Sequence, residues 1–104
     1  MTIVVDPLFD TTPFTTSRTP RCFRNTRACH LMTTLHGEEG RRELVDFARR
    51  LGLSPAWIQY PGTPRQHFDL VASKRLIAVR LGAVEVDRRW ACGDPLPVRS
   101  RRTP

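Results

Sequence analysis

The side chains best able to do chemistry are concentrated in one short stretch of the second half of the chain. His67 can transfer a proton near neutral pH, and Asp69 can orient a histidine, hold a metal or cap a helix. The single lysine, Lys74, follows closely in a chain that otherwise uses sixteen arginines for positive charge, which suggests that a compact point charge is needed there. The neighbouring side chains Ser73 and Arg75 add a hydroxyl and a second cation.

This cluster leads into an apolar stretch, residues 71–81, that predicts a largely buried helix ended by Gly82, with Ser73, Lys74 and Arg75 near its start. The first turn of a helix offers unpaired N–H groups and partial positive charge, which suit an anion. The stretch therefore predicts an anion site for a phosphorylated ligand or a nucleotide.

The elements that would position these residues indicate an α/β fold in a single domain, residues 1–87. Strands are predicted at residues 2–6, 28–33, 56–60 and 83–86. A helix from residue 38 to 51 follows from the spacing of Leu44, Phe47, Ala48 and Leu51. Strands that alternate with helices favour a small, mostly parallel four-stranded sheet with two main helices.

In a parallel sheet, ligands bind beyond the carboxyl ends of the strands, and the predicted strands deliver several polar residues there. The expected catalytic residues are His67, Asp69 and His30. The expected ligand-binding residues are Asp6, Gln59, Ser73, Lys74 and Arg75. Simpler interpretations stay open: Asp69 as a helix cap, Lys74 as a solvated charge and His30 as a hydrogen-bonded strand residue.

A resident metal is assigned to none of these residues from the sequence alone. The pattern His-x-Asp at residues 67–69 forms half of a two-histidine, one-carboxylate site, with His30 as a conceivable third ligand. A divalent metal therefore stays open as an alternative cofactor. Phosphate-loop, dinucleotide, serine-hydrolase and zinc-protease motifs are absent from the sequence.

The formal charge of +7 is unevenly distributed along the 104 residues. Residues 11–37 contain four arginines and no acid, and residues 88–104 contain five arginines and one aspartate. We expect residues 7–27 to form an irregular basic loop and residues 88–104 a disordered Pro/Arg-rich tail. Both could contact nucleic acid without sequence preference or an acidic protein, so a non-enzymatic binding module is the alternative function.

The remaining composition predicts a cytoplasmic protein without a membrane segment. Apolar runs fall far short of the roughly 20 residues that span a bilayer, and the first ten residues lack the pattern of a secretory signal. The three cysteines, Cys22, Cys29 and Cys92, show no paired motif and are expected to be free thiols.

Several short stretches resemble the domain-of-unknown-function family 4031 of small bacterial and phage proteins. They read VVDP, CHL, ELVDFARRLGL, HFDL, SKR and LGAVEV, in the order and spacing of that family. The resemblance implies a small α/β domain and marks the positions Asp6, His30, His67, Asp69 and Arg75. It implies no reaction. Whether the protein is an enzyme therefore stays open. If it is one, hydrolysis of a phosphoester is the reaction class to test first.

Overall fold

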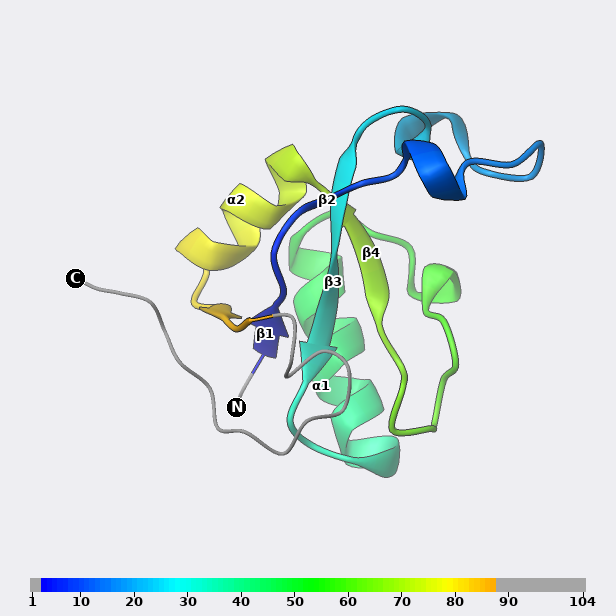
Figure 1. Cartoon of the computed structure of the whole chain (residues 1–104). Coiled ribbons are helices and arrows are strands. Elements are labelled where there is room, and N and C mark those ends of the chain that lie inside the picture. The colour runs from blue at the N-terminus through cyan, green and yellow to red at the C-terminus, as the bar shows by residue number, and fades with distance from the viewer. Residues whose placement is uncertain (1–2, 88–104) are drawn as a thin grey trace.

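The computed structural model describes residues 3–87, which form one small α/β domain: a five-stranded mixed sheet with two helices (Figure 1). The central strand is β3 (Arg27–Thr33). Along one side it pairs antiparallel with β1 (Ile3–Val5) and β2 (Phe9–Asp10), and along the other with β4 (Phe68–Val71). The short strand β5 (Val84–Glu85) adds to β1 in the parallel direction.

The expectation of a mostly parallel four-stranded sheet is therefore wrong, although the α/β class and the two helices are confirmed. Part of the predicted strand 56–60 is instead a 3-10 turn, Pro55–Trp57, and Gln59 forms only an isolated bridge with His67. Residues 68–71, for most of which the sequence predicted no element, form β4. Because residues 60–66 reverse the chain before β4, this strand runs antiparallel to β3.

Both helices pack on one face of the sheet. Helix α1 (Gly37–Arg50) carries acids in its first turn and arginines in its last, and its buried side chains include Leu44 and Phe47. Helix α2 (Ala72–Arg80) contributes Ala78. These residues join Leu31 and Leu70 of the sheet in a single core, so apolar burial against one sheet face holds both helices in place. The expectation that the second helix is largely buried is wrong, because Leu76 and Ile77 of α2 are exposed.

Residues 7–27 combine the two-residue strand β2 with two 3-10 turns, Thr12–Phe14 and Arg21–Phe23. In Figure 1 the part of this segment that follows β2 projects from the sheet where β2 ends and β3 begins. The guanidinium of Arg24 donates hydrogen bonds to the carbonyls of Ser17 and Thr19 and so ties the segment together. The predicted tail 88–104 lies outside the described residues. Within residues 3–87, no helix is both long and apolar enough to cross a bilayer.

Candidate functional site

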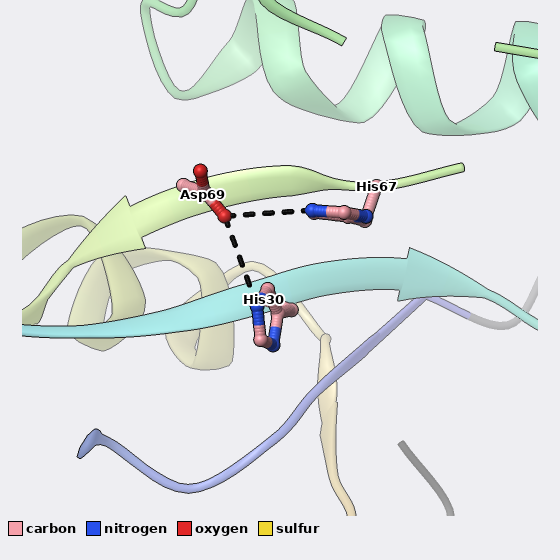
Figure 2. A group of neighbouring side chains, drawn as sticks. All are labelled: His30, His67 and Asp69. Carbon is pink, nitrogen blue, oxygen red and sulfur yellow. Dashed lines mark ion pairs between the residues drawn. The ribbon is translucent and has the colours of Figure 1, made fainter. Parts of the chain in front are cut away.

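Three of the expected site residues meet on the sheet face opposite α1 and α2, here called the helix-free face (Figure 2). Along β4, Phe68 and Leu70 are buried in the core, so the side chain of Asp69 points to the other face. His30 lies directly opposite Asp69 in the register of β3 and β4. His67 precedes Asp69 by two residues and shares its face.

The three side chains converge on a small space. The Oδ1 atom of Asp69 is 3.6 Å from Nε2 of His67 and 3.9 Å from Nε2 of His30. The two imidazole rings lie edge to face, with centroids 4.9 Å apart. One ligand atom from each residue can be chosen so that all three lie within 4.8 Å of one another.

The hydrogen bonds of the other ring nitrogens define how the two histidines are oriented. Nδ1 of His67 is 2.8 Å from the carbonyl of Arg65, and Nδ1 of His30 is 2.7 Å from Oδ2 of Asp6. A carbonyl and a carboxylate can only accept, so both Nδ1 atoms must donate. In a neutral imidazole this leaves the lone pair on Nε2, and both Nε2 atoms face Asp69.

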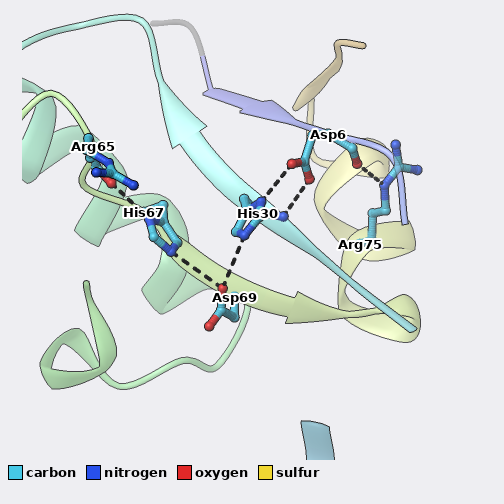
Figure 3. Close-up of polar contacts among 6 residues, drawn as sticks. All are labelled: Asp6, His30, Arg65, His67, Asp69 and Arg75. Atoms are coloured by element: carbon cyan, nitrogen blue, oxygen red, sulfur yellow. Dashed lines mark hydrogen bonds and ion pairs between the residues drawn. The ribbon is translucent and has the colours of Figure 1, made fainter. Parts of the chain in front are cut away.

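Asp6 fixes His30 through backbone and side chain together (Figure 3). Its Oδ1 accepts a hydrogen bond of 2.6 Å from the backbone N–H of His30, while Oδ2 holds the ring. Arg75 in turn donates through Nε to the carbonyl of Asp6 and forms an ion pair of 3.1 Å with Glu85. The strand end at Asp6 is thus anchored to α2 and β5 as well as to β3.

The charges of the cluster support one another. The hydrogen bond to Asp6 raises the pKa of His30 above its ordinary value of 6.5; partial burial opposes this, and the charges of Asp6 and Asp69 add to it. Partial burial acts to raise the pKa of Asp69. Its contacts with His67, His30 and Gln59 outweigh burial, so the pKa lies below the ordinary 3.8. These two shifts favour the ionised carboxylate of Asp69 next to the positively charged form of the His30 ring.

The loop before β4 positions His67 and contributes two further polar side chains, Gln59 and Gln66. The side-chain amide of Gln59 donates a hydrogen bond to Oδ2 of Asp69. Gln66 is buried, and its side chain accepts from the N–H of Gly62 and donates to the carbonyl of Gly37. This residue attaches the loop to the start of α1 immediately before His67.

The residues expected at the start of α2 do not join this cluster. Lys74 donates through Nζ to the carbonyl of Leu51 at 2.6 Å, so it binds the end of α1. Ser73 is exposed on α2. Arg75 acts on Asp6 from behind the site. The N-cap of α2 is Val71 without a side-chain cap, so Asp69 does not cap that helix. The cluster of His30, His67 and Asp69 lies in the middle of a sheet face, whereas the sequence predicted a site beyond the carboxyl ends of the strands.

Sequence reasoning missed two groups that contact the histidines, Phe9 and the carbonyl of Arg65. The ring of Phe9 stacks on His30 with centroids 5.4 Å apart. Phe9 lies in a two-residue strand that shows no period of its own. The alternation of apolar and polar residues in HFDLV, by contrast, is a strand signal that was available in the sequence.

The sequence model of a family described as "Protein of unknown function (DUF4031)" matches residues 17–93, and the chain belongs to that family. His30, His67 and Asp69 lie within the matched range, whereas Asp6 precedes it. No solved structure matches the chain significantly.

Proposed function

We propose that the protein binds a divalent transition-metal ion through His30, His67 and Asp69 and uses it to hydrolyse phosphoesters. The observation that carries the proposal is that both Nδ1 atoms are held by hydrogen-bond acceptors while both Nε2 atoms face the same carboxylate oxygen. Three electron-pair donors that face one another repel unless a proton or a cation lies between them.

The donor set matches known metal chemistry. Two imidazoles and one carboxylate suit zinc, manganese, iron and related ions. Ligating histidines commonly donate their other N–H to a carboxylate or a backbone carbonyl, and Asp6 and the Arg65 carbonyl supply one of each. Three protein ligands leave coordination positions for water and substrate, as in catalytic zinc sites.

Phosphoester hydrolysis is the reaction class that such an ion favours. Held by His30, His67 and Asp69, such an ion would lower the pKa of a bound water, to about 7 in the case of zinc, and would stabilise the charge that develops on phosphoryl oxygens. The water oxygen forms the new bond to phosphorus and the bond from phosphorus to the leaving oxygen breaks. The leaving oxygen takes up the proton that the water released. In this proposal His67 is a ligand, which replaces the role of proton carrier expected from the sequence.

Metal binding is tested by isothermal titration calorimetry of the metal-free protein with Zn²⁺ and Mn²⁺. We expect one ion per chain. His30→Ala and His67→Ala should each weaken binding by more than the about 10- to 100-fold that loss of an outer-shell partner costs. His36→Ala is the matched control, because His36 is exposed at the start of α1 and outside the cluster. Equal affinity in all three variants would rule out the site.

Hydrolysis is tested with bis(p-nitrophenyl) phosphate in the presence of the ion that binds. Release of p-nitrophenolate should require the metal, persist in His36→Ala and disappear in His67→Ala. A protein that binds the ion at these residues yet releases no p-nitrophenolate from this diester or from p-nitrophenyl phosphate would refute the hydrolase and leave a structural metal site.

A further inference from the structure

A row of rings crosses the helix-free face on both sides of the histidine pair. Phe14 lies edge to face against Phe9 at 5.9 Å, and Phe9 stacks on His30 at 5.4 Å. On the other side, the ring of Tyr60 lies 6.0 Å from that of His67. The row therefore runs from Phe14 to Tyr60 and includes both candidate histidine ligands.

The two ends of the row are exposed. Phe14 has 69% of its surface accessible and Tyr60 has 54%. Aromatic side chains that pack in a protein core are mostly buried, so neither ring belongs to the core. They come from segments far apart in the sequence, the 3-10 turn Thr12–Phe14 and the loop before β4. Two exposed rings with a polar cluster between them suit a ligand that carries planar groups on either side of a charged centre.

Positive charge accompanies the rings at both ends. The guanidinium of Arg65 lies over the Tyr60 ring at 5.3 Å from its centroid. The segment that carries Phe14 also carries the exposed residues Arg18 and Arg21, and no ion pair joins either of them to an acid within residues 3–87. These cations complement phosphates, and stacking of bases on aromatic rings is the usual complement in single-strand binding.

We infer that the substrate is a single-stranded nucleic acid, whose bases stack on Phe14 and Tyr60 so that the phosphate backbone between these bases crosses the His30–His67–Asp69 cluster. This inference rests on the proposed function and assigns the substrate class for the same site. A single strand is required because the bases of a duplex are already stacked on each other and present no free faces.

The test is fluorescence anisotropy with a fluorescein-labelled 12-nucleotide single strand of mixed sequence, in EDTA so that binding is measured without hydrolysis. The same strand as a duplex and an abasic strand of equal length are the comparisons. We expect the single strand to bind at least tenfold more tightly than either. An abasic strand that binds equally well would overturn the inference, because phosphates alone would then account for the affinity.

Matched variants connect the affinity with the rings. Phe14→Ala and Tyr60→Leu should each weaken single-strand binding about 5- to 150-fold, the cost of one lost stacked base. Tyr60→Phe, which keeps the ring, should bind normally. Leu76→Ala, an equally exposed apolar residue on α2, should also bind normally. Wild-type affinity in both Phe14→Ala and Tyr60→Leu, or equal competition by poly-glutamate, would contradict a nucleic-acid surface.

The two proposals fail in different experiments. Phe14 and Tyr60 are not metal ligands, so calorimetry should show that Phe14→Ala and Tyr60→Leu still bind the metal ion with wild-type affinity. If wild-type protein does not cleave bis(p-nitrophenyl) phosphate, the proposed hydrolase activity is refuted, whereas the result on single-strand binding still stands. Normal cleavage without preference for single strands over abasic strands refutes only the substrate assignment.

Discussion

Asp6 is the residue on which the orientation of the site depends most. It accepts from both the backbone N–H and the ring of His30, so it fixes the strand and the imidazole together. Asp6→Asn should weaken metal binding about 10- to 100-fold, because outer-shell carboxylates set the basicity and direction of a ligating histidine. Calorimetry measures this change. Asp10→Asn, an exposed aspartate in β2, is the control and should bind normally.

The same contact predicts a pH effect in the metal-free protein. The Asp6 hydrogen bond raises the pKa of His30 above 6.5. A raised pKa means that the pair stabilises the fold fully below about pH 6.5 and that this contribution is lost as the pH rises through the folded-state pKa. NMR titration of the His30 ring should show the raised pKa in wild-type protein and a lower one in Asp6→Asn. An unchanged His30 pKa in that variant would exclude Asp6 as its cause.

Burial makes the thiol of Cys29 unreactive. It lies on β3 in the core, and burial raises the pKa of its thiol to about 12. At pH 8 the reactive thiolate is then on the order of one molecule in ten thousand. In a Cys92→Ser background, Ellman's reagent should modify one thiol, the exposed Cys22, in native protein and two in guanidinium. Rapid modification of both thiols without denaturant would contradict a closed core.

At the scale of elements, the contact between α1 and the turn before it leaves no room for a side chain. A Cβ atom on Gly40 would lie 2.3 Å from the carbonyl oxygen of Leu35 and 3.2 Å from Nε2 of Gln66. Gly→Ala inside a helix ordinarily stabilises by about 1 kcal/mol. Here Gly40→Ala should lower the free energy of unfolding by about 1–3 kcal/mol, as overpacking does.

Urea denaturation measures this effect, with Arg42→Ala on the exposed side of α1 as the control. The control should change the free energy of unfolding by less than about 0.5 kcal/mol. A stabilised Gly40→Ala protein would show that the turn at Leu35 can move away from the helix.

Both helices could be predicted from the sequence because their signals are local. The spacing of Leu44, Phe47 and Ala48 and the acids in the first turn identify α1 without any tertiary information. Strand direction is not local. Once Trp57 lies in a 3-10 turn and Phe68 begins a strand, the chain enters the sheet from the opposite end, and the parallel order inferred from element sequence no longer holds.

The site was predicted in the same uneven way. His30, His67 and Asp69 were identified by residue type, and the register of β3 against β4 brings them together. Lys74 was predicted as a site residue because it is the single lysine of the sequence, yet its Nζ atom donates a hydrogen bond to the Leu51 carbonyl at the end of α1. Residue type indicates which groups could act, whereas only pairing and alternation decide which sheet face they share.

At the scale of the whole molecule, the candidate site and the apolar core lie on opposite faces of the sheet. The helices bury one face, which leaves the other for polar residues and rings. Residues 38–87 hold eight basic and seven acidic side chains, so they are nearly neutral. The charge excess instead lies in the segment that carries Phe14 and beyond the described residues. Electrostatic attraction and base stacking should therefore respond to different changes.

Salt titration separates these two contributions to single-strand binding. Each phosphate neutralised on a single strand contributes about −0.7 to the slope of log K against log salt concentration. Replacing Arg18 and Arg21 together by alanine should make the slope less steep by about 1.4 while the preference for a normal over an abasic strand persists. Phe14→Ala should do the reverse, with the slope unchanged and the preference reduced. If the double arginine variant keeps the wild-type slope, the phosphate contacts come from outside this segment, as the sequence alternative of a basic tail predicts.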